Sequence, residues 1–539
     1  MTVKLLALGG LGEFGANSLL LEDPDGGRVL VDAGAAFSDM AAFGVAYEVP
    51  DFGAMRDGGL NALVLTHAHD DHIKGLSFVR EAFPEIEVLA SRTTLAWGRR
   101  ALEDDEPLVT RELRPGETTA AGPVRVEALP VSHSIPGSVA LRLVTSAGRL
   151  VLATDLRLAP SALDEQTSAE TLARWGDEGL DGLLLDATNA LVTDEPVSEA
   201  TVESTLAEEV RRVGGTVVAV SFASHLGRFR QLALAAHAAG RVIVPVGRGL
   251  VESLDVQGQL GGLRLPPGLV RPARELARLP RNQVVVAATG AQGEPGSAFS
   301  RLAVDLIPGL RLRREDVVLH AARVIPGNER RLAQLFDHCV RRGARVVTAA
   351  EAPIHVSGHP HVGELARMLE LLRPRWVLPV HGRRRHLEEV AKLARRHGSA
   401  TVVAENGEEL EWSHGTLAPS GELRPCGRVL LEDVGEEVLD SGMLRHRRAL
   451  AREGLVVVVL GCGEEGPAAA PQLHVSGLPL DEGVRARLVA GLAVELARLG
   501  VLARRDPDAL RSTMTRWLRS ELRRRTRRRP VIVALVVEL

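Results

Sequence analysis

Short apolar runs separated by glycine-rich turns open the chain. Residues 3–8, 18–21 and 28–32 consist mostly of leucine and valine and have the length of strands rather than buried helices. A helix is predicted from about residue 74. Four further apolar runs of strand length follow, at 87–91, 124–133, 140–146 and 149–155. This pattern predicts a β-rich layer at the start of the protein.

The middle of the chain, from about residue 195 to 360, has a different pattern of apolar runs. Apolar runs of strand length, such as TVVAV and QVVVAA, alternate with helical patterns such as GRFRQLALAAHAAG and GNERRLAQLFDHCVRRG. Alternation of strands and helices at this spacing is typical of an α/β domain with a largely parallel sheet. We therefore predict a second domain of this class.

The last part of the chain is predicted to form a further unit. The glycine- and proline-bearing stretch at 414–427 favours a linker, and residues 428–449 are expected to continue it. The final 90 residues follow the order strand, long helix, helix, strand, which predicts a small α/β domain. The run RRRTRRR at 523–529 is either an RNA contact or a solvated helix end whose positive charge suits the helix dipole.

Composition is that of a soluble globular protein with two to four domains. The 539 residues are 45% hydrophobic, and no apolar stretch approaches the 18 or so residues of a membrane span. Three scattered cysteines form no disulfide framework and suit a reducing compartment, so a cytoplasmic location is expected. The net charge of −4 excludes a general attraction to nucleic acid, and any polyanion site must be a local basic groove.

The stretch THAHDDHIKG, at 66–75, follows the apolar run NALVLT and concentrates three histidines and two aspartates in six positions. Neutral imidazole and carboxylate are ligands of divalent cations. In an extended segment the side chains of His67 and His69 leave the same face and can converge on one ion, while Asp71 and His72 can turn towards a second. The spacing therefore predicts a two-metal site.

Four ligands cannot complete two coordination spheres, and three more candidates each end an apolar run. These are His133, Asp155 and His381. A lone residue of this kind is usually a turn residue, but the nearby histidine cluster favours ligation. The expected cofactors are two divalent ions per chain, zinc or manganese, with zinc favoured. One ion would be held by His67, His69 and His133, the other by Asp71, His72 and His381, with Asp155 bridging them.

This order of ligands, HxHxDH followed by a later His, Asp and His, resembles the metallo-β-lactamase superfamily. His381 stands 226 positions after Asp155, much further than in simple members, which implies an insert. A metallo-β-lactamase domain split in this way resembles the β-CASP nucleases. The resemblance implies an αββα sandwich interrupted by a β-CASP α/β insert and followed by a small C-terminal α/β domain. The implied bounds are 1–195 and 362–425 for the two parts of the first domain, 196–361 for the insert, 426–449 for the linker and 450–539 for the C-terminal domain.

Within that group the chain resembles the bacterial ribonuclease J family nearly end to end. The blocks that carry the resemblance include LGGLGEFGANS (8–18), SHSIPGS (132–138), LLDATNA (184–190), TGAQGEPGSAFSR (289–301), IPGNE (325–329) and HVSGHPH (355–361). The family implies a metal-dependent ribonuclease that degrades single-stranded RNA from its 5′ end and also internally. It further implies a homodimer or homotetramer formed through the C-terminal domain, and an RNA-degradation assembly as a partner.

The resemblance also implies roles for individual residues. Asp71 would orient the attacking water and accept its proton, Asp186 matches the first β-CASP motif, and His359 would hydrogen-bond the scissile phosphate or assist the leaving oxygen. The alternative interpretation of His359 is a polar residue that precedes a helix and has no catalytic role. The residues expected to contact RNA are Phe37, Ser224, His225, Arg228, Ser357, Gly358, His359 and His361. Phe37 is either a base-stacking platform or a core residue.

Two motifs depart from the family pattern. The second β-CASP motif reads FASHLGR, so that Gly227 stands at a family histidine position, and either His225 substitutes for it or the contact is lost. Pro360 and His361 replace the usual alanine and serine. These departures motivate an alternative, a non-catalytic or weakly active RNA-binding subunit. A DNA-directed β-CASP nuclease is a further alternative, because the ligands alone do not discriminate RNA from DNA.

Overall fold

The computed structural model describes residues 1–539 except 103–107, 164, 195, 326 and 433–436. Contacts divide the chain into two compact units, one of residues 1–36 with 49–428 and one of residues 37–48 with 429–539. The predicted domain boundary at residue 195 lies outside the described residues, as do Pro326 of the IPGNE block and part of the predicted linker.

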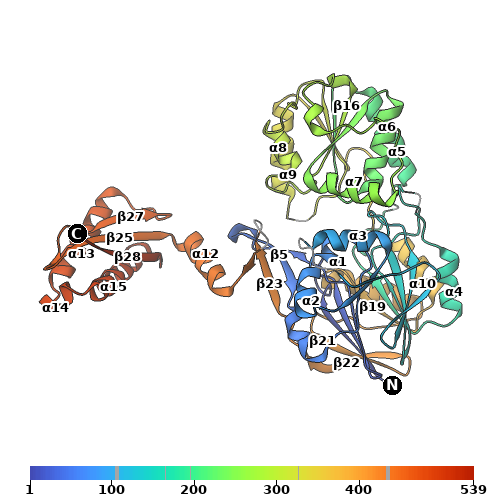
Figure 1. The fold of residues 1–539 in the computed structure, drawn as a ribbon, viewed down its shortest axis with the longest axis horizontal. Helices are drawn as coiled ribbons and strands as arrows, with labels where there is room; N and C mark the ends of the chain where they lie inside the picture. Colours follow the sequence, from blue (N-terminus) through green and yellow to red (C-terminus); the bar gives the residue numbers. More distant parts are fainter. Residues whose placement is uncertain (103–107, 164, 195, 326, 433–436) are drawn as a thin grey trace. The chain divides into compact units, whose positions relative to one another are not determined.

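Two facing β-sheets form the centre of the first unit (Figure 1). The first sheet has the order β22(Thr416–Leu423), β21(Glu408–Ser413), β1(Val3–Gly9), β2(Ser18–Asp23), β3(Gly27–Val31), β6(Ala62–Val64), β7(Glu87–Ala90), β8(Thr110–Glu112). The second has the order β20(Ala400–Thr401), β19(Trp376–Val380), β13(Gly182–Asp186), β12(Gly148–Ala153), β11(Val139–Thr145), β10(Val124–Pro130), β9(Thr118–Ala121).

Helices cover the outer face of each sheet, because most of the strands are apolar on both sides. In β1, Leu5 and Ala7 pack into the core between the sheets, whereas Leu6 and Leu8 pack into the core beneath the helices. Helices α1(Asp70–Ile73), α2(Leu76–Ala82) and α3(Arg92–Ala101) lie over the first sheet, and α4(Ala169–Asp177), α10(Val362–Leu372) and α11(Arg384–Arg396) over the second. The result is an αββα sandwich.

The second domain is inserted between two neighbouring strands of the sandwich. β13 pairs in parallel with β19, so that Asp186 lies opposite Val380, although almost 190 residues separate the two strands in the sequence. The insert has a five-stranded parallel sheet of the order β15(Val242–Val246), β16(Val284–Ala288), β14(Val217–Val220), β17(Val317–His320), β18(Arg345–Thr348). This is the parallel α/β domain that the sequence predicts.

Helices cover both faces of this parallel sheet (Figure 1). On one face lie α5(Glu199–Arg212), α6(Leu226–Ala238) and α7(Arg248–Leu260), and on the other α8(Ala298–Ala303) and α9(Glu329–Arg341). Val217 and Ala219 face the first group, and Val218 and Val220 face the second. Burial on both faces explains why the sequence shows continuous valine-rich runs here rather than alternation.

The prediction of a linker at 414–427 was wrong for most of its length. Residues 416–423 form β22, which pairs antiparallel with β21 at the edge of the first sheet. His414 and Gly415 make the turn with φ of 50° and 73°, the left-handed conformation that a tight hairpin requires. Gly415, Pro419 and Gly421 therefore belong to a hairpin and an edge strand.

The second unit contains the C-terminal domain and a small sheet. Residues 426–449, predicted as a linker, include β23(Arg428–Glu432), β24(Val438–Leu439) and the start of α12(Ser441–Glu453), and β23 and β24 share a sheet with β4(Ala36–Phe37) and β5(Val45–Pro50). The C-terminal sheet has β25(Leu455–Gly463) at its centre, flanked by β26(Gly466–Pro467), β27(Gln472–Ser476) and the parallel β28(Val531–Glu538). Helices α13(Glu482–Ala497), α14(Val501–Arg504) and α15(Pro507–Thr526) complete the domain.

Candidate metal centre

Three histidine rings converge at the ends of two strands. His67 and His69 follow β6, and His133 follows β10. His69 Nδ1 lies 3.0 Å from His67 Nε2 and 3.1 Å from His133 Nε2. These three nitrogens form the group that the sequence predicts for one ion.

A second cluster lies beside the first and contains Asp71, His72, Asp155 and His381. His381 Nε2 lies 3.0 Å from Asp71 Oδ2, and His72 Nε2 lies 3.3 Å from Asp155 Oδ2. Asp155 and His381 adopt φ of 52° and 59°, so each strand end turns in the left-handed conformation. The structure thus brings together all seven predicted ligands, and Asp155 lies between the two groups, 4.0 Å from His133 Nε2.

The outer ring nitrogens are held by residues to which the sequence analysis did not assign this role. His72 Nδ1 donates to Asp32 Oδ2 at 2.7 Å, and His133 Nδ1 donates to the Gly358 carbonyl at 2.9 Å. His67 Nδ1 lies 3.0 Å from Thr66 Oγ1, and His381 Nδ1 lies 2.5 Å from Thr188 Oγ1. Such contacts fix the tautomer and aim the opposite nitrogen at a metal.

The donor atoms of the three-histidine group fit a cation. Thr66 Oγ1 donates to Asp32, so its lone pairs accept from His67, and the inner nitrogens of His67 and His133 then carry lone pairs. His69 Nδ1 can donate to only one of them, whereas a cation satisfies all three. Burial lowers the pKa of His133 to about 4, and burial together with the His133 charge lowers that of His69 to about 3. The rings therefore stay neutral, as ligation requires.

The carboxylates of the second cluster favour a positive charge on the histidines beside them. Burial alone would lower the pKa of His381, but Asp155, Asp71 and Asp186 raise it to about 9. Burial likewise opposes the charged form of His72, yet Asp155, Asp71 and Asp32 raise its pKa well above the ordinary value. Asp155 Oδ2 is buried without a hydrogen-bond partner among the described residues. A divalent cation is the natural partner of this donor set.

Asp186 and His359 form a pair at the edge of the second cluster. His359 Nδ1 lies 2.8 Å from Asp186 Oδ2 and 3.5 Å from Asp155 Oδ1. Burial would lower the pKa of His359, but Asp186 and Asp155 raise it. The His359 side chain is 22% exposed, whereas Asp186 is fully buried, so His359 is the member of the pair that a substrate can reach.

The other residues of the HVSGHPH block make contacts within the protein. Ser357 Oγ accepts from Asn189 Nδ2 at 3.0 Å, and His361 Nδ1 lies 3.1 Å from the Asp194 carbonyl. Glu364 accepts from His361 N in the first turn of α10. This carboxylate already compensates the N-terminus of α10, so not all of its free N–H groups are available to a phosphate.

The second β-CASP motif lies in the interior of the fold. His225 is buried and caps α6, accepting from Arg228 N at 3.3 Å. Arg228 is completely buried and pairs with Glu199 Oε2 at 3.2 Å, a contact within the insert. Gly227 packs against Ala162, and a Cβ atom there would lie 2.7 Å from the Ala162 Cβ. A histidine at 227 would therefore displace this segment.

Two further residues that the sequence predicts as RNA contacts are Ser224 and Phe37. Ser224 is half-buried between β14 and α6. Phe37 belongs to the second unit and is 65% exposed, with its ring centroid 5.3 Å from that of Tyr47. This exposure contradicts the interpretation of Phe37 as a core residue and leaves the base-stacking hypothesis.

Comparison with known proteins supports the same architecture. Family models match the metallo-beta-lactamase superfamily over residues 11–191, the ribonuclease J beta-CASP domain over 214–339, the Zn-dependent metallo-hydrolase RNA specificity domain over 344–404 and the ribonuclease J C-terminal domain over 442–539. Ribonuclease J of Mycobacterium tuberculosis is 34% identical, and the alignment covers 100% of this chain and 97% of the relative. The chain belongs to the ribonuclease J family.

A second ribonuclease J protein is similar to this chain over its whole length. That of Mycolicibacterium smegmatis is 32% identical over 100% of this chain and 97% of its own length. A protein of unknown function from Enterococcus faecalis shares the fold, with a TM-score of 0.53 and 13% identity over 76% of this chain and 99% of that one. The predicted fold class is confirmed. No helix in the described part of the chain is long and apolar enough to cross a membrane.

The contact between Asp32 and His72 generates a test. Asp32→Asn removes the charge that orients His72 and is expected to weaken zinc binding about 10- to 100-fold, the usual cost of losing such a partner. Competition with a chromogenic chelator measures the affinity, and thermal unfolding checks the fold. Asp51→Asn is the control, because among the described residues the Asp51 side chain accepts only a nearby backbone N–H, from Gly53. Unchanged zinc affinity in Asp32→Asn would contradict the orienting role.

Proposed function

We propose that the protein removes nucleotides from the 5′ end of single-stranded RNA and also cuts RNA internally. As a member of the ribonuclease J family, the chain is an RNA-binding, metal-dependent ribonuclease. The direction of attack and the number and identity of the metals are what the proposal adds. The observation that carries it is the convergence of seven ligand side chains next to the Asp186–His359 pair. The comparisons do not favour a non-catalytic subunit or a DNA-directed nuclease.

Two divalent ions per chain would occupy the centre. His67, His69 and His133 would hold one, and the imidazole-rich set suits zinc. Asp71, His72 and His381 would hold the other, with Asp155 shared, and this mixed set also accepts manganese. When bound, such ions acidify water and neutralise charge that develops on a phosphodiester.

Asp71 would orient the attacking water. Its Oδ2 atom contacts His381 Nε2 at 3.0 Å and Asn17 Nδ2 at 3.3 Å, which fixes the carboxylate. Burial would raise the pKa of Asp71, but His72 and His381 outweigh burial and lower it. A carboxylate of low pKa holds a proton only briefly, so Asp71 would pass the proton of the water on to solvent.

His359 would donate to the scissile phosphate or to the departing oxygen. Asp186 binds Nδ1, which leaves Nε2 as the nitrogen that can reach the substrate. The raised pKa favours the protonated ring, and a protonated imidazole is the form that can stabilise developing negative charge. Asp186 therefore acts through His359, as a positioning residue.

A cavity of about 480 Å³ beside Ser357 offers a place for the 5′ phosphate. It lies at the carboxyl ends of β17 and β18, where ligands of open α/β sheets usually bind, and His361 and Arg323 also line it. Arg323 is held by Asn189 Oδ1 at 2.7 Å, and the same Asn189 donates to Ser357. One guanidinium supplies countercharge for one phosphate, whereas a triphosphate needs more.

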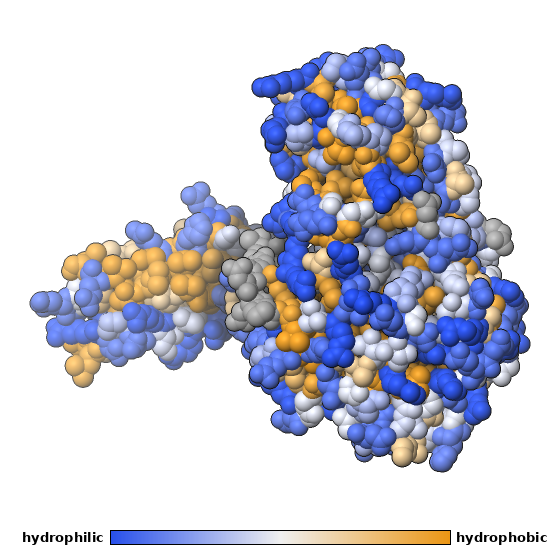
Figure 2. Space-filling model, turned by 45° about the vertical axis from the view of Figure 1, so that its right-hand side comes forward, coloured by the Kyte–Doolittle hydropathy of each residue, from blue (hydrophilic) through white to orange (hydrophobic). Residues whose placement is uncertain are grey.

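The C-terminal domain would form the contacts of a homodimer or homotetramer. The inner face of its sheet packs on α13 and α15, but β28 turns Val533, Leu535 and Val537 outwards, and these side chains are 39 to 46% exposed. Figure 2 shows apolar side chains gathered on this domain. A contiguous exposed apolar face is typical of a protein interface, and a second copy of the chain is the partner we propose.

Asp186→Asn tests the catalytic pair. Without the carboxylate, His359 loses the charge that favours its protonated form, and the cleavage rate is expected to fall about 10- to 1,000-fold. Elemental analysis should still find close to two metals per chain, because Asp186 is not a proposed ligand. Loss of metal together with activity would show that Asp186 serves the metals instead.

The 5′-end preference is tested with one labelled RNA that carries a 5′ hydroxyl, monophosphate or triphosphate. The monophosphate is expected to react fastest and to release mononucleotides before internal fragments, because the cavity supplies countercharge for one phosphate. Arg323→Gln should remove the preference, while Arg330→Gln, an exposed arginine of α9, should not. Equal rates on all three ends, with fragments first, would mean internal cleavage without a working 5′ site.

Assembly through the C-terminal sheet is tested by light scattering. Leu535→Lys with Val537→Lys places two charges on the outer face of β28 and is expected to convert the assembly into monomers. Leu502→Lys, at an 84% exposed position on α14, is the control and should leave the mass unchanged. An unaltered mass in the double variant would place the interface elsewhere.

A further inference from the structure

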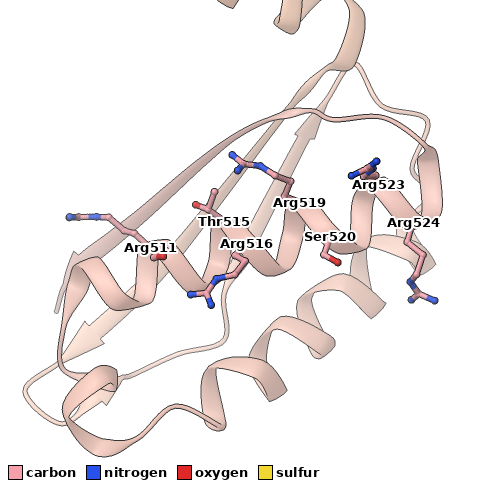
Figure 3. Close-up of a pocket in the computed structure, with 8 residues that line it drawn as sticks. Arg511, Thr515, Arg516, Arg519, Ser520, Arg523 and Arg524 are labelled. Atoms are coloured by element: carbon pink, nitrogen blue, oxygen red, sulfur yellow. The ribbon is translucent and has the colours of Figure 1, made fainter.

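One face of α15 carries arginine and hydroxyl side chains. Arg511, Arg516, Arg519, Arg523 and Arg524 are exposed and line a groove of about 810 Å³ together with Ser512, Thr515 and Ser520. Figure 3 shows these arginines projecting from the helix. The opposite face packs into the domain core through Leu510, Met514, Leu518 and Leu522. The arginine face therefore contributes nothing to the core and is open to a partner.

Neither helix stability nor solubility explains the excess of arginine on this face of α15. A favourable interaction with the helix dipole extends only over the last turn, so it accounts for Arg523 and Arg524 but not for Arg511, Arg516 and Arg519. The neighbouring helix α13 has two arginines and two glutamates, whereas residues 511–529 contain nine arginines and one acidic residue. Repulsion among like charges costs stability, so the excess indicates an anionic partner.

Three of the arginines have no ion pair with any described residue. Arg511 pairs with Asp508 at 2.8 Å and Arg524 with Glu521 at 2.8 Å. In the described part of the chain, no ion pair engages Arg516, Arg519 or Arg523. Successive members of this set lie three and four residues apart on one helix, hence about 4.5 to 6 Å apart along its axis.

We propose that this face of α15 binds the backbone of single-stranded RNA, independently of sequence. The proposal rests on the proposed function as a ribonuclease and adds a substrate contact in the C-terminal domain, far in sequence from the metal ligands. Arginine and hydroxyl groups are the usual partners of phosphate oxygens. Trp517 packs against the domain core, so the aromatic residue that could stack on bases is turned away from this face. The recognised chemistry is thus a row of phosphates.

The test uses the full, metal-loaded chain and an RNA with non-hydrolysable phosphate linkages, so that RNA is bound but not cleaved. Arg516→Glu, Arg519→Glu and Arg523→Glu are combined, and binding of a labelled 30-nucleotide RNA is measured by anisotropy from 50 to 200 mM salt. Binding is expected to weaken by on the order of tenfold at 50 mM, and the slope of log affinity against log salt should fall by about 2, since each lost phosphate contact on a single strand accounts for about 0.7.

The control reverses three exposed arginines on the same domain. Arg485→Glu, Arg487→Glu and Arg498→Glu change the net charge equally but lie on α13 or at its end, and they should have a much smaller effect. Equal weakening by both triple variants would reduce the effect to net charge and overturn the proposal. Unchanged RNA binding with an altered oligomeric mass would make the α15 face a protein interface, which also overturns it.

Failure of this proposal is distinguishable from failure of the proposed function. On unmodified RNA, wild-type protein that cleaves RNA while the α15 variant binds RNA normally would refute only the α15 contact. Absence of cleavage by the wild-type protein would refute the function itself.

Discussion

Parallel pairing of β13 with β19 is the interaction on which the site depends. The pairing places the end of β13, with Asp186, next to the end of β19, from which His381 follows. Thr188 then reaches His381 Nδ1, and His381 reaches Asp71 on the other side of the centre. Because the β-CASP domain is inserted between these two strands, its last segment returns to the same edge. That segment supplies His359 and the Gly358 carbonyl that holds His133. The insert is therefore part of the metal centre as well as a separate domain.

Burial of so many titratable groups couples the metals to the fold. Desolvation favours neutral imidazoles in the three-histidine group, while the carboxylates of the second group favour a positive charge among them. Divalent ions would satisfy both groups at once, and their binding energy would then contribute to folding. The outer contacts of the rings, above all Asp32 with His72, are formed by the protein itself and prepare the ligands for this role.

The sequence was informative where chemistry and secondary structure coincide. The seven ligand candidates were recognised because each follows an apolar run, and a residue at a strand end is positioned by local backbone geometry. The parallel insert was recognisable for a similar reason, since valine-rich strands alternate with amphipathic helices. The same local reasoning failed at 414–427, where glycine and proline signal a turn but do not say whether the chain leaves the sheet afterwards. Pairing of β22 with β21 decides that, and it depends on a partner strand.

Residue types and strand-end positions by themselves determined the candidate ligands and the division between a β-rich and a parallel α/β part, and the resemblance to a known family supplied the αββα fold class. Only the tertiary structure decided which side chains face solvent. His225 and Arg228 carry the chemistry of RNA contacts, yet packing of α6 against Ala162 and Glu199 buries them. The orienting partners of the ligands, such as Thr188 for His381, lie up to hundreds of residues away in the chain. Local sequence specifies backbone and chemistry, but burial and long-range partners follow from how distant segments pack, and no local pattern contains that information.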